Sequence, residues 1–308
     1  MQTMNTQLAI KDRKILVTGA SGYIGPRLCR RLLHIGADVA AVSRTRPPID
    51  DRRLRWSAVD LSDRIATAEL LKKKTPDIIF HLAGYAAGGR EMDLVAPTFF
   101  SNLLTTVNIL AASTDCGVRR IVLPGSLEEP AGESSEFVPS SPYAASKWAA
   151  SAYARMFNKL YETPVVILRL FMTYGPGRQN PNKLIPYVIR SLLQKKAPEL
   201  SSGHREIDWI FIDDAVEGMI YAAQAPDVGG HTLDLGSGEP VTIRALVEKL
   251  VDIIDPRVRP MFGALSERPM EQVRVADIDR TYRRTGWKAN IALEDGLRQT
   301  VEWFRTQL

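Results

Sequence analysis

The stretch Gly19-Ala20-Ser21-Gly22-Tyr23-Ile24-Gly25 decides the fold that we expect from this sequence. An apolar, β-branched run at 14–18, typical of a buried strand, precedes it, and residues 26–33, apolar at helical spacing, follow it. Glycines at this point allow a tight turn, close approach of the backbone to a pyrophosphate, and close helix–strand packing. The N–H groups and the positive end of the helix then face the phosphates. The stretch therefore predicts the start of a dinucleotide-binding unit; an ordinary glycine-rich turn is the alternative.

The composition is that of an ordinary globular protein. The chain has 308 residues, 45% hydrophobic and 24% charged, which suits one large α/β unit or two modest domains. Its net charge of +5 comes without a long basic run, which favours anionic small molecules over nucleic acid as partners. Cys29 and Cys116 lie far apart and lack metal-ligand spacing, so we expect no metal site and a reducing compartment, the cytoplasm. No signal peptide and no membrane-spanning run is visible, so we expect no membrane.

Strands alternate with helices through the first half of the chain. Strands are expected at 38–43, 54–59, 78–84, 120–126 and 165–170, and helices at 62–74, 96–116 and from Pro142. This order predicts an α/β fold with a doubly wound parallel sheet, a Rossmann domain over 8–171 with returning elements near 208–236. Pro, Asn and Gln cluster after 174–177, so we place a smaller C-terminal α+β substrate-binding domain at 172–308. Its expected elements are strands at 209–212 and 232–235 and helices at 213–223, 242–254 and 293–306.

The end of the second strand bears on the choice between NAD and NADP. A site specific for NAD places Asp or Glu about 20 residues after the glycines, where it binds the ribose 2′-OH. Here Ser43 and Arg44 stand at that point, with Arg46 beyond. An acidic side chain would repel a 2′-phosphate, whereas Arg and Ser suit one. We therefore predict NADP as the cofactor, with NAD as the alternative and a solvated surface arginine as the plain interpretation of Arg44.

Three polar side chains are expected together at the carboxyl ends of the strands. Ser126 ends one strand, and Tyr143 and Lys147 lie four residues apart on one face of the next helix. A tyrosine hydroxyl, with a pKa of about 10, is a poor base unless a nearby ammonium lowers that pKa. We predict that Ser126 orients a substrate oxygen and that Tyr143 exchanges its proton during hydride transfer. His81, alone on an apolar strand, is predicted to be a core histidine.

Together these motifs resemble the extended short-chain dehydrogenase/reductase family, the NAD(P)-dependent epimerase/dehydratase group. The resemblance runs from about Ile15 to Phe304. Its carriers are the glycine stretch, Asp60-Leu61, His81-Leu82-Ala83-Gly84, Asn102, Ser126, Tyr143 with Lys147, 169–171 with 174–177, Asp213-Asp214, 236–240 and Gly286-Trp287.

The resemblance implies NAD or NADP as cofactor and nucleotide-activated sugars as substrates. It also implies homodimers joined through the helices that carry Asn102 and Tyr143, and it puts Asn102 among the catalytic residues. By the same match Asp60 and Leu61 lie near the adenine, and Lys147 holds the nicotinamide ribose. The expected cofactor-binding residues are Gly19, Ser21, Gly22, Tyr23, Ile24, Gly25, Ser43, Arg44, Asp60, Leu61, Leu82, Ala83, Gly84, Tyr143 and Lys147.

The substrate side departs from the family pattern. Met172 stands where members using nucleotide sugars often have Asn, and Ile207 stands where they often have Arg before Asp208. Arg205, two residues upstream, shares a strand face with Ile207 if the chain is extended there, so it is a candidate replacement. Lys183 and Arg268 are the other expected ligands of the substrate's phosphates.

The serine loop bears on the reaction type. Sugar 4,6-dehydratases of the family have Thr or Ser, Asp and Glu where this chain has Ser126-Leu127-Glu128, and the missing middle acid argues against dehydration. Glu128 is a candidate catalytic acid or base, or else a solvated loop carboxylate. We favour an NADP-dependent oxidoreductase acting on a nucleotide-activated sugar, a 4-keto sugar reductase. A 4-epimerase is the alternative, and a 4,6-dehydratase or a non-enzymatic NADP-binding protein is less favoured.

Overall fold

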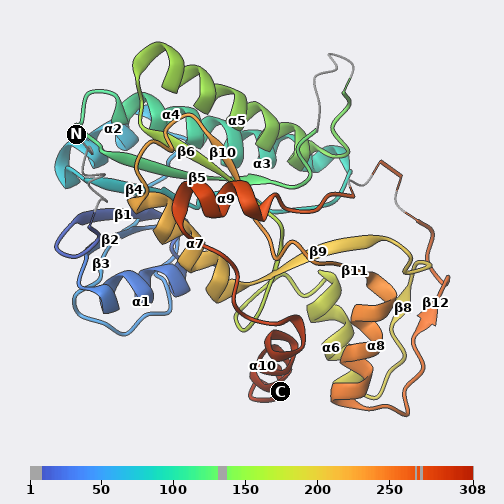
Figure 1. The fold of residues 1–308 in the computed structure, drawn as a ribbon. Coiled ribbons are helices and arrows are strands. Elements are labelled where there is room, and N and C mark those ends of the chain that lie inside the picture. The colour runs from blue at the N-terminus through green and yellow to red at the C-terminus, as the bar shows by residue number, and fades with distance from the viewer. Residues whose placement is uncertain (1–8, 131–136, 268, 271–272, 308) are drawn as a thin grey trace.

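The centre of the molecule is a seven-stranded sheet, seen in a computed structural model that describes residues 9–130, 137–267, 269–270 and 273–307 (Figure 1). Its strands are β1 (Lys14–Thr18), β2 (Asp38–Val42), β3 (Arg55–Ser57), β4 (Ile78–His81), β5 (Arg120–Ser126), β6 (Val165–Leu170) and β10 (Thr232–Leu235). They lie in the order β10-β6-β5-β4-β1-β2-β3, and every neighbouring pair is parallel. The order reverses direction between β1 and β4, and in such sheets ligands bind beyond the strand ends at this switch point. The predicted doubly wound parallel sheet is confirmed.

Helices cover both faces of this sheet (Figure 1). One face carries α1 (Gly25–Ile35) and α7 (Ile212–Gln224), and the other carries α2 (Arg64–Lys74), α4 (Thr105–Ser113) and α5 (Pro142–Tyr161). Successive side chains of β1 point to opposite faces, so Val17 packs into the core beside α1 while Leu16 packs into the core beside α2 and α4. Asp63 caps α2 by accepting hydrogen bonds from the N–H groups of Ile65 and Ala66.

The helix expected at 96–116 starts earlier and is not uniform. It runs through η1 (Met92–Leu94), α3 (Val95–Thr98), η2 (Phe99–Leu104) and α4, and η2 is a π-helical turn. Among the described residues it is the one helix long and apolar enough, by length and composition, to cross a membrane. Its Asn102, however, is buried and bonds to Ser146 of α5, and α4 packs against α2, so the helix forms part of the layer on the sheet.

The second half of the chain builds a smaller α+β part beside the carboxyl ends of the large sheet (Figure 1). It contains β7 (Met172–Tyr174), β8 (Glu199–Leu200), β9 (Glu206–Phe211), β11 (Pro240–Thr242), β12 (Met261–Phe262), α6 (Leu184–Leu193), α8 (Ile243–Ile254) and α10 (Leu293–Arg305). The helices enclose a separate core around Trp209, Val247 and Leu297. In contrast, α7, β10 and α9 (Ile278–Thr285) return to the large sheet.

Candidate functional site

The glycine turn between β1 and α1 leaves no room for side chains. A Cβ on Gly19, whose φ is 64°, would lie 2.5 Å from the carbonyl carbon of Leu82, and a Cβ on Gly25 would lie 2.4 Å from the carbonyl oxygen of Gly19. Among the described residues no side chain caps the first turn of α1, so no side chain occupies the place of a ligand at this helix end. A cradle of bare backbone at a helix N-terminus fits the pyrophosphate of a dinucleotide.

Replacing Gly25 by Ala should weaken the binding of NAD and NADP alike. The added methyl group collides with backbone, and overpacking of this kind costs about 1–3 kcal/mol, or roughly 5–150-fold in affinity. Calorimetric titration with each cofactor measures the effect. Gly229→Ala is the matched control, because a Cβ there makes only an ordinary contact with Asn158. Unchanged cofactor affinity in Gly25→Ala would contradict this placement of the pyrophosphate.

The end of β4 is held against the glycine turn by a buried hydrogen-bond pair. Thr18 Oγ1 accepts the N–H of Ala83 at 3.1 Å and donates to His81 Nδ1 at 2.8 Å. Burial, together with the positive charge of Lys147, lowers the pKa of His81 to about 3, so the ring is neutral. The prediction of a core histidine is confirmed. The pair fixes the backbone of Leu82 and Ala83 beside the glycine turn.

The end of β2 gives Ser43 and Arg44 different environments. Ser43 is buried, and its hydroxyl donates to the carbonyl oxygen of Thr45 at 2.7 Å and accepts from Trp56 Nε1 at 3.1 Å. The hydroxyl proton of Ser43 is therefore already used within the turn. The sequence had predicted that Ser43 donates this proton to a 2′-phosphate instead. Arg44 is exposed, so the predicted contact with a 2′-phosphate now depends on Arg44 and no longer on Ser43.

Asp60 and Leu61 lie near Arg44. Hydrogen bonds from the backbone and hydroxyl of Ser62, with a smaller contribution from the charge of Arg44, hold the pKa of Asp60 below its usual value. The carbonyl oxygen of Leu61 accepts from Asn108 Nδ2 at 2.9 Å, which ties this loop to α4. The loop therefore presents a fixed carboxylate next to an exposed guanidinium.

Ser126, Tyr143 and Lys147 are brought together as expected. Ser126 is the last residue of β5, and its side chain is hydrogen-bonded to Tyr143 in the first turn of α5. One turn later, Lys147 Nζ donates to the carbonyl oxygen of Pro124 at 2.9 Å. The backbone N–H of Glu128 donates to Ser126 Oγ at 3.2 Å, so the candidate acid stands directly beside the serine. This arrangement suits proton transfer to or from an oxygen held by Ser126.

Tyr143 keeps its proton more firmly than the sequence suggested. Burial raises its pKa well above the usual value, and the Glu128 carboxylate raises it further, whereas the hydrogen bond from Ser126 only partly opposes them. Lys147 was expected to lower this pKa. Instead burial lowers the pKa of Lys147 itself to about 8, against the raising effect of Glu129. At neutral pH the protein therefore holds a neutral phenol beside an ammonium group.

Asn102 is held by hydrogen bonds to two neighbouring segments, and its expected catalytic role stays a prediction. Its Oδ1 accepts from the N–H of Tyr85 at 2.7 Å, and its Nδ2 donates to Ser146 Oγ at 2.9 Å. Ser146 in turn donates to the carbonyl oxygen of Tyr143 at 2.8 Å. The π-helical turn η2 directs the amide to these partners, and such turns are frequent at functional sites. The amide thus joins the 85 loop to the helix that carries Tyr143.

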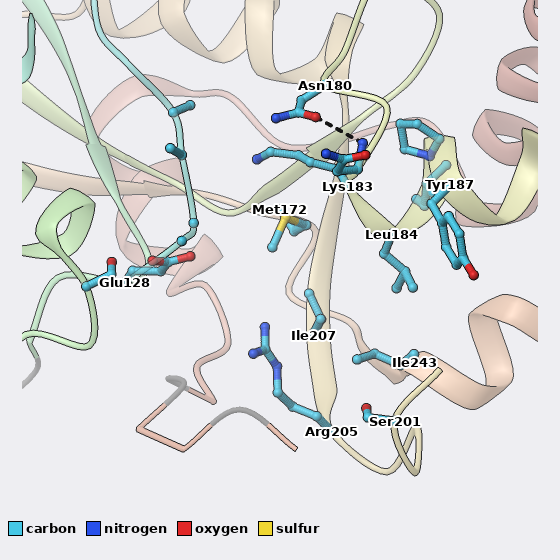
Figure 2. A pocket seen from close by; sticks show the side chains of 18 of the residues that line it. Glu128, Met172, Asn180, Lys183, Leu184, Tyr187, Ser201, Arg205, Ile207 and Ile243 are labelled. Atoms are coloured by element: carbon cyan, nitrogen blue, oxygen red, sulfur yellow. Dashed lines mark hydrogen bonds between the residues drawn. The ribbon is translucent and has the colours of Figure 1, made fainter. Parts of the chain in front are cut away.

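A cavity of about 470 Å³ opens between Tyr143 and the smaller part of the molecule. Figure 2 shows Glu128 on one side, Lys183 on the other and Met172 between them, with Arg205 below. Arg205 directly precedes β9, and Ile207 is the second residue of that strand. Both line the cavity, which confirms that they share a strand face. Arg268 lies outside the described residues, so its role stays a prediction.

The burial of several carboxylates, Glu129 and Asp208 among them, was not predicted from the sequence. Glu129 is only 3% exposed, and its Oε1 accepts the N–H of Ser126 at 2.7 Å. Asp208 is only 1% exposed and accepts N–H groups from Ser237, Gly238 and Ala276. No local signal distinguishes Glu129 from its neighbour Glu128, whereas the position of Asp208 next to an aromatic residue within a strand pattern could have suggested burial.

Comparison with known proteins identifies the family. The family model for the NAD dependent epimerase/dehydratase family matches residues 15–236. The chain belongs to this family. Its curated relatives include a probable dTDP-glucose 4,6-dehydratase of Sinorhizobium fredii, 30% identical over 94% of this chain and 92% of the relative. A UDP-glucuronate 4-epimerase of Thermodesulfobacterium geofontis is 26% identical over 95% and 96%. The solved structure of MoeE5 in complex with UDP-glucuronic acid and NAD is 29% identical, with a TM-score of 0.83 over 96% of this chain and 100% of that one.

Membership confirms the resemblance inferred from the motifs and makes this chain an enzyme of the extended short-chain dehydrogenase/reductase family. A nicotinamide cofactor of this epimerase/dehydratase family supplies or accepts a hydride at the sugar carbon. In this chain the cofactor would be held by the glycine turn, the end of β4 and Lys147.

Proposed function

We propose that this enzyme is an NADP-dependent reductase of a 4-keto sugar carried on a nucleotide. The neutral Tyr143 phenol, hydrogen-bonded to Ser126 at the mouth of the cavity, carries the proposal. Reduction of a ketone needs a proton donor at the carbonyl oxygen, and burial together with Glu128 keeps that proton on the phenol. Ser126 orients the oxygen, and the Lys147 ammonium stabilises the negative charge that develops on Tyr143.

The nucleotide part of the substrate is assigned to the basic end of the cavity. Lys183 directly precedes α6, and Arg205 lies on the same wall as Ile207. Both cations line the space (Figure 2). Between them lies Met172, at the position where family members using nucleotide sugars often have Asn. The diphosphate is therefore assigned to the two cations. Guanidinium groups bind phosphate through charge-assisted, often bidentate hydrogen bonds.

Replacing Arg205 by Ala should weaken the binding of UDP, used as a probe of the diphosphate site, by roughly tenfold or more. The loss is that of a charged hydrogen-bond partner. Calorimetric titration with UDP measures it, and Arg298→Ala, which removes an exposed arginine of α10 paired with Glu294, is the matched control. Equal UDP affinity in the two variants would contradict the diphosphate site.

A 4-epimerase is the second candidate, because two of the curated relatives are 4-epimerases and stand beside several 4,6-dehydratases. One curated relative is a UDP-glucuronate 4-epimerase, and MoeE5 was solved with UDP-glucuronic acid and NAD. The same three catalytic residues serve an epimerase, which oxidises and re-reduces one sugar with a retained cofactor. A 4,6-dehydratase has less support, because Leu127 is a buried apolar residue where the family's middle acid stands.

Cofactor retention separates the two candidates. We expect the purified enzyme to carry much less than one equivalent of dinucleotide and to consume one NADPH for each nucleotide sugar reduced. A full equivalent of NAD released on denaturation, with epimerisation and no net NADPH consumption, would replace the reductase by the epimerase.

We further propose that the enzyme is a cytoplasmic homodimer joined through η2 and α5. Phe99, Phe100 and Tyr153 are between 42% and 50% exposed, which is unusual for aromatic side chains and leaves an apolar surface on the helices that the family resemblance implicates. Light scattering on the eluted protein measures the mass, and a monomer at micromolar concentration would contradict the dimer.

A further inference from the structure

We propose that Glu129 is a positioning residue for the catalytic group: its buried carboxylate anchors the backbone of Ser126 and provides the counter-charge of Lys147. The inference rests on the catalytic roles given above to Ser126, Tyr143 and Lys147. It concerns a residue that does not line the substrate cavity but lies behind it, on the far side of the serine.

The geometry of the anchor is local and tight. Glu129 Oε1 accepts the N–H of Ser126 at 2.7 Å, while the N–H of Glu129 donates to the carbonyl oxygen of Ser126 at 3.1 Å. A Cβ on Gly125 would lie 2.6 Å from the same Oε1, so the carboxylate is pressed against the end of β5. Both backbone groups of Ser126 are thus fixed by one residue, which sets where its hydroxyl points.

Polar and charged groups from two neighbouring elements face the carboxylate. Lys147 and the hydroxyl of Ser151 come from α5, and Arg169 comes from β6. A second, polar pocket behind Glu129 adds Arg155, Arg274 and Asp234 to its lining, and Asp234 accepts from Arg169 Nη1 at 2.7 Å. Arg169 already has its own carboxylate partner, whereas Glu129 is the one acidic group among the described residues that acts on the charge of Lys147.

A carboxylate with 3% exposure is costly to bury, so its retention needs a compensating interaction. Burial raises the pKa of Glu129, and the hydrogen bond from the N–H of Ser126 together with the positive charges of Arg169 and Lys147 opposes this rise. In return, the carboxylate opposes the lowering of the Lys147 pKa that burial causes. Removing the negative charge stabilises the deprotonated form of every group nearby. Loss of the Glu129 charge is therefore expected to lower the pKa of Lys147 and, by a smaller amount, the pKa of Tyr143.

The test separates charge from hydrogen bonding with two variants. Glu129→Gln keeps an acceptor for Ser126 and removes the charge, whereas Glu129→Asp keeps the charge and shortens the reach to Ser126. The titration of Lys147 is followed by competitive acetylation with acetic anhydride between pH 6 and pH 10 and mass spectrometry, in the whole enzyme without substrate. We expect the midpoint, near pH 8 in the unmodified enzyme, to fall by roughly one unit or more in Glu129→Gln and to stay in Glu129→Asp.

Glu128→Gln is the matched control, because the charge of Glu128 raises the pKa of Tyr143, whereas the pKa of Lys147 responds to burial and to Glu129. An unchanged Lys147 midpoint in Glu129→Gln, or an equal shift in Glu128→Gln, would overturn the counter-charge role. Circular dichroism confirms that each variant folds, and turnover in Glu129→Asp reports the anchor separately: full activity there would overturn the positioning of Ser126. Since acetylation needs no substrate, a shifted midpoint in an enzyme that reduces no nucleotide sugar would leave this inference intact and remove the proposed function instead.

Discussion

Replacing Tyr143 by Phe should lower kcat by about 10²–10⁴-fold, the usual contribution of a positioned acid or base. The change removes the transferable proton and leaves the ring in place, so packing around α5 should persist. Cofactor affinity should stay nearly the same, because the glycine turn that binds the pyrophosphate lies on β1 and α1. Steady-state rates with a nucleotide-linked 4-keto sugar and NADPH, together with cofactor titration, measure both quantities.

Tyr153→Phe is the matched control for this experiment. Tyr153 lies on the same helix, is 42% exposed and lies outside the cavity lining, so its variant should keep normal turnover. Near-normal turnover in Tyr143→Phe would mean that another group handles the proton, and Glu128 beside Ser126 would be the first to examine.

Replacing Arg44 by Asp should reverse the order of cofactor affinity. The unmodified enzyme is expected to bind NADP more tightly than NAD, and the variant should change the ratio of the two dissociation constants by roughly 10²–10³-fold. The substitution removes a guanidinium from the 2′-phosphate, adds a repelling charge and provides an acceptor for the ribose hydroxyls of NAD. The contrast should shrink at high salt, because an exposed pair is screened over a Debye length of ~8 Å at physiological ionic strength.

Calorimetric titration of each protein with both cofactors checks this prediction, and Arg52→Asp, at another exposed arginine of the following loop, controls for the general change in charge. If the unmodified enzyme binds NAD as tightly as NADP, Arg44 is a solvated arginine. The cofactor preference would then no longer support the reductase, and the epimerase would be favoured.

The large sheet could be predicted because its signals are local. The strands at 120–126, 165–170 and 232–235 have the predicted bounds, since each is a short, largely buried and mostly apolar run. The short strands β7, β8, β11 and β12 contain only two or three residues, so no pattern of alternation can form in the sequence. They are held by long-range pairing, such as that between β7 and β9, which no local window contains.

In the candidate site, too, the features that follow from local spacing could be predicted, and those that depend on long-range packing could not. The sequence placed Ser126, Tyr143 and Lys147 together, because strand ends and helix faces follow from spacing alone. It missed the burial of Glu129, which depends on α5 and β6 closing over a loop, and the inward hydroxyl of Ser43, which depends on Trp56. It also gave the wrong direction for the pKa of Tyr143, because burial is a property of the folded chain and outweighs a single neighbouring charge.

Transfer of deuterium from [4,4-²H₂]NADPH, labelled on both faces of C4, to a nucleotide-linked 4-keto sugar tests the proposed hydride transfer directly. We expect one deuterium at C4 of the reduced sugar for each NADPH oxidised, with transfer lost in Tyr143→Phe. Consumption of NADPH without label at C4, or reduction of the free sugar as readily as its nucleotide form, would contradict it.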